Sequence, residues 1–254
     1  MSENILRFES LTIFVLTINE TELLRKTVEE IRKNCCDVDL KKIVIVAKSK
    51  NCLGYFEAKK LIDESTDRKV ELYIQRENDS LKCIYELPSL VESSHFVIMG
   101  ADMETNPDNI SAFIEKAKAH PERIICASKW LSESTIEGYG IIHEIGSRAM
   151  NKFVALLFNT KAKDVFSAYQ IYPLCVYKKI KFDRPSTFIH EYTLKPLRVG
   201  IEYEEIPTTY KKRTDGKSSV NVLFMLRLAI GFCTTALRIR FTPKRYLLNE
   251  EKHR

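Results

Sequence analysis

The stretch SSHFVIMGADMETNP, residues 93–107, gives the clearest indication of how this chain folds. Four apolar residues, Phe96 to Met99, form a run typical of a buried strand, and Asp102 and Glu104 follow it before a proline. Carboxylates are seldom buried without a partner, so the strand must end where the chain leaves the core. The sequence therefore predicts a strand whose carboxyl end faces solvent or a cleft.

Short apolar runs alternate with segments of helical periodicity along the first half of the chain. The runs typical of strands are LTIFVLT (11–17), KIVIVA (42–47), KVELYIQ (69–75), HFVIM (95–99) and RIICASK (123–129). Helical spacing is found in about 20–34, 54–65, 80–92 and 107–119. This alternation predicts an α/β fold with a mostly parallel sheet and helices on both faces.

In a parallel sheet of this kind, ligands bind outside the carboxyl ends of the strands. Asp102 and Glu104 lie one step beyond the fourth predicted strand, so we expect them to face a cleft. Two alternatives remain open from the sequence. Asp102 could cap the helix near Pro107, or both acids could be solvated loop residues.

The composition is that of a globular protein with one large domain or two small ones. The chain has 254 residues, 44% of them apolar and 29% charged. Its seven cysteines show no C-x-x-C or Cys/His metal spacing, which favours a reducing cytoplasm. Residues 1–20 lack the basic start and long apolar run of a signal peptide, so we expect a cytoplasmic protein.

Positive charge is concentrated near the C-terminus. The net charge is +6, and residues 195–254 hold 13 Lys and Arg against 6 Asp and Glu. A basic tail on a nearly neutral body predicts an anionic partner at that end, such as acidic lipid, nucleic acid or a phosphate-bearing substrate. We do not expect nucleic acid, because the basic residues are not interleaved with aromatics on a recognisable module.

Several stretches resemble, in order and spacing, the motifs of family 2 glycosyltransferases. They are FVLTINETELL (14–24), VIMGADMETNPDNI (97–110), DVFSAYQIY (164–172) and the long stretch from Phe188 to Ser219. The layout is most similar to that of dolichyl- and polyprenyl-phosphate glycosyltransferases. The resemblance implies a GT-A fold and sugar transfer from a nucleotide-activated donor.

The resemblance also implies a site. Asn19, Glu20 and Asp102 match residues that bind the nucleotide sugar. Asp102 would also hold Mg²⁺ or Mn²⁺, and Glu104 could supply a second carboxylate. A hard divalent cation offsets the charge of a diphosphate leaving group. The matching phosphate-binding residues are Arg148, Arg213, Lys217 and Ser218.

Four departures from the family pattern stand at important positions. Gly100 replaces the first acid of the metal motif, and Ala47-Lys48 replace an Asp-Asp pair that helps to hold the base. Leu16 stands where relatives have proline, and Ala168 stands where they have glycine. These substitutions leave open the alternative that the protein is a catalytically weak relative that binds a nucleotide.

Several candidate residues have simpler interpretations. Asn19 and Glu20 could start the first helix, since Asn is a favoured cap and acids suit a helix N-terminus. Arg148 could lie on a solvated helix face, and only the resemblance favours a role in binding.

Two acids are candidates for acid–base chemistry at the acceptor. Asp164 could act as a base or orient the acceptor, and a turn-forming Asp is the alternative. Glu191 is the second candidate, whereas the adjacent His190 is expected to pack or cap. An acceptor that is already an ionised phosphate would need no strong base.

The tail VNVLFMLRLAIGFCTTALRIRFTPKR (220–245) predicts a helix apart from the domain of residues 1–219. A membrane span needs about 20 apolar residues, and Arg227 in the middle would cost roughly 2.5–3.5 kcal/mol. We therefore expect residues 220–254 to form a basic amphipathic tail whose helix lies in an anionic membrane interface. The alternative is a core helix or an interface between copies of the chain.

The leading hypothesis is a sugar transferase acting on a polyprenyl phosphate, peripheral on the cytoplasmic face of the membrane. A soluble transferase that extends a glycan or modifies a protein is the alternative within the enzyme class. A nucleotide-binding relative with weak catalysis is the alternative outside it.

Overall fold

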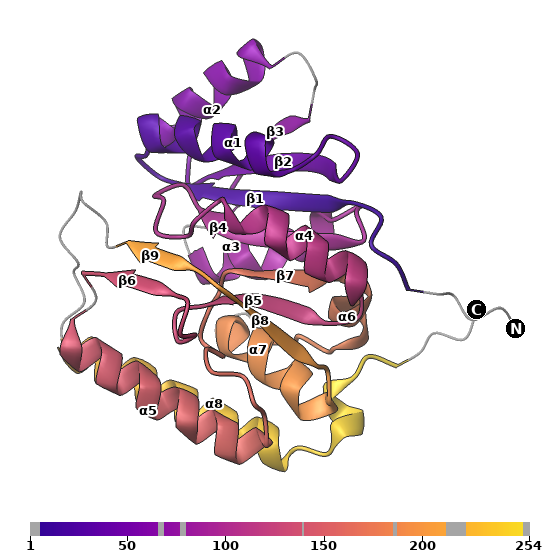
Figure 1. The fold of residues 1–254 in the computed structure, drawn as a ribbon, viewed down its shortest axis with the longest axis vertical. Coiled ribbons are helices and arrows are strands. Elements are labelled where there is room, and N and C mark those ends of the chain that lie inside the picture. The colour runs from indigo at the N-terminus through magenta and orange to yellow at the C-terminus, as the bar shows by residue number, and fades with distance from the viewer. Residues whose placement is uncertain are drawn as a thin grey trace, which may run out of the picture.

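Seven strands form the central sheet in a computed structural model that describes residues 6–65, 69–76, 80–138, 140–184, 187–211 and 222–250. In spatial order they are β3 (Val70–Ile74), β2 (Leu40–Ala47), β1 (Leu11–Thr17), β4 (His95–Gly100), β7 (Gln170–Pro173), β5 (Ile124–Ser128) and β8 (Tyr203–Pro207). A separate pair, β6 (Thr135–Glu137) and β9 (Thr209–Lys211), extends beyond the ends of β5 and β8 (Figure 1).

Helices cover both faces of this sheet. They are α1 (Glu22–Asn34), α2 (Leu53–Glu64), α3 (Ser80–Glu86), α4 (Asn109–Ala119), α5 (Ile141–Phe158), α6 (Leu174–Lys179), α7 (Phe188–Val199) and α8 (Val222–Phe241). Two 3₁₀ helices, η1 (Leu87–Leu90) and η3 (Lys244–Leu247), extend the helical segments at α3 and α8.

The sheet is parallel except at β7, which lies antiparallel between β4 and β5. The predicted α/β class with a mostly parallel sheet is confirmed, and so are the five predicted strands. The position of β7 was not predicted, because its four residues are too few to show a period.

Alternate residues of the central strands pack into two different cores, as the pleat of a strand requires. Ile13 of β1 packs with Leu24 and Phe113 from α1 and α4 on one face. Phe14 packs with Tyr172 in the core of the other face. Burial on both faces explains why β1, β2 and β4 read as continuous apolar runs rather than alternating ones.

A third core joins the C-terminal helix to the rest of the fold. It contains Val154 of α5, Leu194 of α7 and, from α8, Phe232, Ala236 and Ile239. Figure 1 shows α5 and α8 running side by side, and Arg240 Nε donates to the Leu157 carbonyl at 2.7 Å. The predicted C-terminal helix is thus present, and one of its faces is buried.

No helix in the described part of the chain is both long enough and apolar enough to cross a membrane. The outer face of α8 nevertheless exposes Ile230, Leu237 and Phe241. The predicted boundary between residues 219 and 220 lies outside the described residues, so the division into two domains stays a prediction.

Candidate functional site

The carboxyl ends of β1 and β4 lie next to each other, and their loops leave the sheet together. Leu16 is paired with Gly100, and the Ala101 N–H donates to the Leu16 carbonyl at 2.9 Å. Asn19 and Glu20 therefore follow the same edge of the sheet as Asp102 and Glu104. The structure brings these four predicted residues to one side of the fold.

The loop after β1 is organised by Glu20. Its Oε2 accepts hydrogen bonds from the backbone N–H groups of Ile18 at 2.7 Å and Asn19 at 3.1 Å, and from Thr17 Oγ1 at 3.1 Å. Helix α1 begins two residues later, at Glu22, with Thr21 at its N-cap. Glu20 thus stabilises the turn that carries Asn19, whose side chain is exposed.

The loop after β4 turns back over its own strand. A β-carbon at Gly100 would lie 2.9 Å from Asp102 Oδ1, and the same oxygen accepts the Glu104 N–H at 3.2 Å. Met103 between them has a left-handed backbone, with φ of 59°, which non-glycine residues seldom adopt. The Asp102 carboxylate therefore lies next to the space that a side chain at residue 100 would need.

These residues fit a divalent metal site that is completed by substrate. The structured part of the chain holds no group of three or more His, Cys, Asp or Glu residues that could bind a metal ion. Asp102 and Glu104 are both half-buried at the strand end. Mg²⁺ is commonly held by one or two carboxylates together with substrate phosphates, and this pair can supply those ligands.

A second group forms at the carboxyl end of β5 around Asp164. The side chain of Asp164 is fully buried, and its Oδ2 accepts the Lys129 N–H at 2.9 Å and pairs with Lys129 Nζ at 3.0 Å. The Asp164 N–H donates to Glu205 Oε1 at 2.8 Å. Asp164 thus holds Lys129 in place. Lys129 is the last residue of the predicted strand 123–129, and a charge at the end of a buried strand is the signal that could have identified it.

Arg148 joins this second group from α5. Its guanidinium carbon lies 4.3 Å from the ring centroid of Trp130, the residue after Lys129, and its Nε is 2.9 Å from Glu144 Oε1. Stacking on an indole holds a guanidinium in place while leaving N–H groups for an anion. The side chain of Arg148 is 52% exposed.

The segment after Asp164 ties the two strand ends together. Ser167 Oγ donates to the Ala127 carbonyl at 2.7 Å, and Tyr169 Oη donates to the Asn106 carbonyl at 2.9 Å. Burial raises the pKa of Tyr169 well above its usual value, so the phenol stays neutral. One short segment therefore connects the β5 group with the loop that carries Asp102.

Glu191 belongs to a different network. Its buried carboxylate pairs with Lys195 Nζ at 2.7 Å and Arg238 at 2.5 Å, and it accepts from Thr187 Oγ1 at 3.1 Å. Burial lowers the pKa of His190, whose ring packs edge-on against Phe232. These contacts are those of a structural carboxylate, and the role of Glu191 in catalysis stays a prediction.

Three predicted phosphate-binding residues, Arg213, Lys217 and Ser218, lie outside the described residues. Their assignment also stays a prediction.

No protein-family model matches the chain, but its fold is similar to that of solved glycosyltransferases. One is glucosyl-3-phosphoglycerate synthase from Mycobacterium tuberculosis bound to phosphoglyceric acid, with a TM-score of 0.64 at 10% identity, covering 92% of this chain and 81% of that one. The same figures hold for that enzyme with Mn²⁺, uridine diphosphate and glucosyl-3-phosphoglycerate. A further mycobacterial protein matches with a TM-score of 0.66 at 8% identity, covering 92% of this chain and 76% of that one. The GT-A fold implied by the sequence resemblance is confirmed.

Proposed function

We propose that the chain transfers a sugar from a nucleoside-diphosphate donor to a phosphate-bearing acceptor. The observation that carries the proposal is the position of Asp102 at the carboxyl end of β4, beside the loop after β1. In the same fold, solved enzymes contain uridine diphosphate with Mn²⁺ or Mg²⁺. The edge of the sheet that carries Asn19, Glu20 and Asp102 would bind the nucleotide.

Asp102 and Glu104 would hold Mg²⁺ or Mn²⁺ against the donor diphosphate. When bound, the ion offsets the negative charge that develops on the leaving group. The hydrogen bond from the Glu104 N–H to Asp102 Oδ1 would hold the Asp102 carboxylate in the loop that faces the donor. Gly100 contributes no ligand, so Glu104 would compensate for the missing acid.

Lys129 and Arg148 would bind phosphate on the β5 side. Both are cations beyond the end of β5, and each is held by a neighbour: Lys129 by Asp164 and Arg148 by Trp130. Cations fixed in this way stabilise developing charge without needing to reorganise during the reaction. Asp164 would then act as a positioning residue rather than as a base.

The acceptor would be a polyprenyl phosphate, reached from the cytoplasmic face of the membrane. Exposed Ile230, Leu237 and Phe241 on α8 support contact with lipid, and so does the basic end of that helix. An ionised phosphate nucleophile needs no strong base, which agrees with the burial of both Asp164 and Glu191. By comparison, the solved synthase is in complex with phosphoglyceric acid.

A transfer assay with uridine-diphosphate sugars, Mn²⁺ and a short polyprenyl phosphate in detergent tests this function. Arg148→Ala should lower turnover by about tenfold or more, the value of one charge-assisted phosphate contact. Lys152→Ala removes another exposed cation of α5 and should leave turnover unchanged. Transfer to a glycan or protein but not to the lipid phosphate would favour the soluble alternative.

A second candidate is a nucleotide-binding relative with weak catalysis. Gly100 and Ala47, which replace acids of the family pattern, favour it. Metal-dependent nucleotide binding without transfer or donor hydrolysis would identify this candidate.

A further inference from the structure

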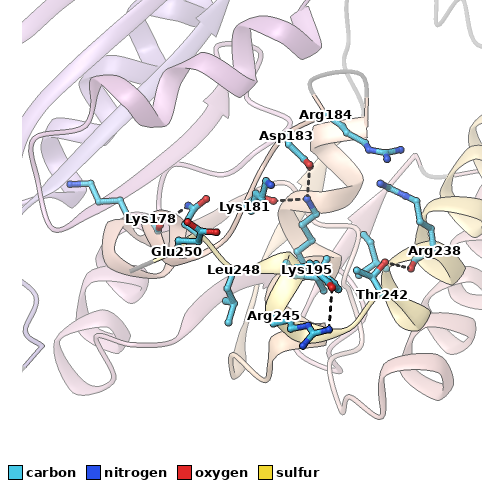
Figure 2. Close-up of a pocket in the computed structure, with 14 residues that line it drawn as sticks. Lys178, Lys181, Asp183, Arg184, Lys195, Arg238, Thr242, Arg245, Leu248 and Glu250 are labelled. Atoms are coloured by element: carbon cyan, nitrogen blue, oxygen red, sulfur yellow. Dashed lines mark hydrogen bonds and ion pairs between the residues drawn. The ribbon is translucent and has the colours of Figure 1, made fainter. Parts of the chain in front are cut away.

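A wide groove lies at the end of the fold formed by α6, α7, the last turns of α8 and η3. Its volume is about 1190 Å³ (Figure 2). The basic residues that line it are Lys178, Lys181, Arg184, Lys195, Arg238 and Arg245, and the acidic ones are Asp183 and Glu250. Figure 1 shows the end of α8 away from the carboxyl ends of β1 and β5, so the groove is separate from the candidate donor site.

Two of these cations are neutralised within the protein. Lys195 is buried and pairs with Glu191 and Asp183, and Lys195 Nζ also donates to the Lys181 carbonyl at 2.5 Å. Arg238 pairs with the other oxygen of Glu191. The carboxylates of Glu191 and Asp183 are therefore engaged by these two residues.

The remaining cations of the groove lack such partners among the residues that the structure describes. Within the described residues, Lys178, Lys181, Arg184 and Arg245 form no ion pair with a carboxylate, and Glu250 is the one acid of the lining not yet engaged. Four positive charges thus face one negative charge across a concave surface. Clefts lined by one sign of charge raise the local concentration of the opposite ion.

The groove is also partly preorganised for an anion. Glu191 fixes the guanidinium of Arg238 at 2.5 Å, while a third of that side chain remains exposed. Figure 2 shows the guanidinium groups of Arg184 and Arg238 on one side of the groove and Arg245 on the other. Arg245 is held by Tyr246, with Nη2 to Oη at 3.1 Å and the cation 4.8 Å from the ring centroid.

The basic end of the tail is divided between two surfaces. Arg238 and Arg245 line the groove, whereas Arg240 and Lys244 do not. Arg240 instead donates to the Leu157 carbonyl. Arg238 and Arg245 are therefore the two cations of this basic cluster that can act in the groove.

We propose that this groove binds a phosphate-bearing anion with at least two ionised phosphate oxygens, at a site separate from the donor cleft. Guanidinium groups match phosphate by paired N–H donors, and lysines add point charge at its rim. The anion would bridge Arg184 of the loop before α7 to Arg238 and Arg245, and so fasten the end of α8 to the rest of the fold. The proposal does not depend on sugar transfer.

Titration calorimetry of the full chain with pyrophosphate, in EDTA and at about 0.15 M ionic strength, tests the proposal. The chain should carry Asp102→Ala, so that metal-dependent binding at the donor site does not contribute. Adding Arg184→Gln with Arg245→Gln should weaken binding by about tenfold or more. Both side chains are exposed and lack carboxylate partners in the described structure, so the fold should persist, as circular dichroism would verify.

Lys179→Gln with Lys244→Gln is the matched control. It removes the same charge from exposed residues of the same region that do not line the groove. This variant should keep pyrophosphate affinity within about threefold of its parent, since distant surface charges are screened. No binding by the parent chain, or equal losses in both variants, would overturn the proposal.

Vesicles distinguish the two sources of phosphate. Co-sedimentation with phosphatidylcholine vesicles that contain phosphatidic acid should be lost in the groove variant, and reversed by pyrophosphate, if a lipid headgroup occupies the groove. If the groove variant still sediments with the vesicles while its pyrophosphate affinity is lost, the occupant is a soluble phosphate compound. Either result supports a phosphate site, whereas unchanged pyrophosphate affinity contradicts it.

Discussion

The carboxylate of Asp102 lies against the position where Gly100 would carry a β-carbon, with 2.9 Å between that position and Oδ1. The acid missing from the metal motif and the acid that remains therefore compete for one space. Glycine at residue 100 allows the loop to fold back, and Met103 takes a left-handed conformation in the same turn. The glycine that replaces the first acid of the metal motif is thus also the residue that gives the Asp102 side chain its space in this loop.

Restoring the missing acid should destabilise the loop. Gly100→Ala brings a β-carbon into contact with the Asp102 side chain, which must turn aside, and should lower stability by about 0.5–1.5 kcal/mol, the cost of an off-rotamer side chain. Gly100→Asp should be less stable still without metal, because it adds a like charge, and Mn²⁺ should recover part of that extra loss. Thermal melting of the two variants with EDTA and with Mn²⁺ measures this. Equal stability of Gly100→Asp and Gly100→Ala in EDTA would show that the carboxylates do not meet.

The buried pair of Asp164 and Lys129 should act mainly through structure and position. Asp164→Asn leaves Lys129 without its counter-charge and should lower stability by about 3–5 kcal/mol. Asp164→Leu combined with Lys129→Met should recover much of that loss, while transfer stays low because a phosphate-binding cation is gone. Glu9→Gln, in the exposed pair with Arg7, is the control and should change stability by less than about 1 kcal/mol. A stable, inactive Asp164→Asn would instead indicate a catalytic base.

The protein should lose stability as the pH is lowered through the range between the unfolded-state and folded-state pKa values of His95. This side chain is 1% exposed, Nε2 lies 3.0 Å from the Pro121 carbonyl, and burial lowers its pKa to about 4 from 6.5. The unfolded chain binds the proton more readily, so this contribution is complete above pH 6.5 and is lost as the pH falls toward 4. The loss should approach roughly 3 kcal/mol.

Urea unfolding between pH 7.5 and 4 would measure that slope. His95→Gln should be less stable at pH 7.5 but should show a shallower decline toward acid pH. His120→Gln, whose side chain is only half-buried, should decline as the parent does. The same slope in all three proteins would show that His95 does not titrate in this way.

Much of the fold can be predicted because strands buried on both faces leave continuous apolar runs, as in Val97 and its neighbours. Beyond these runs the signals fade. β7 has only four residues, and the single predicted helix over 80–92 is divided into α3 and η1, where Pro88 removes a backbone donor. Both features depend on tertiary contacts more than on local pattern.

The sequence likewise predicts some residues of the candidate site but not their partners. Asp102 could be found from its place after a strand, but the ion pair of Asp164 with Lys129 joins residues 35 positions apart. Glu191 pairs with Arg238, which is 47 positions away in the sequence. Arg238 lies on α8, a helix that the sequence alone assigns either to a membrane surface or to the core. Local periodicity shows which strand ends carry charge, whereas the partners of those charges come from the packing of distant elements.

Lipid binding should depend on the exposed side of α8. Removal of the whole tail would also take Phe232, Ala236 and Ile239 out of the third core, so substitution is the cleaner test. Leu237→Ser with Phe241→Ser should weaken co-sedimentation with anionic vesicles by about tenfold or more, since each buried apolar side chain contributes roughly 1.5–3 kcal/mol.

The control for this experiment is Val38→Ser, which removes an exposed apolar residue remote in sequence from α8. It should bind vesicles as the parent chain does, and binding by the parent should weaken as salt rises. If the parent chain remains in the supernatant at low salt, the outer face of α8 serves another purpose.

Metal-dependent binding of a nucleoside diphosphate is the most direct test of the central claim that Asp102 helps to form a donor site. The measurement is thermal melting of the full chain with uridine diphosphate, in Mn²⁺ and in EDTA. At about 100 times its dissociation constant the ligand should stabilise the chain by about 2.7 kcal/mol, and only when Mn²⁺ is present. Asp102→Ala should lose this response, Glu104→Gln should weaken it, and Asp63→Ala, an exposed acid on α2, should retain it. An equal response to Mn²⁺ with uridine diphosphate in Asp102→Ala and in the parent chain would contradict the account.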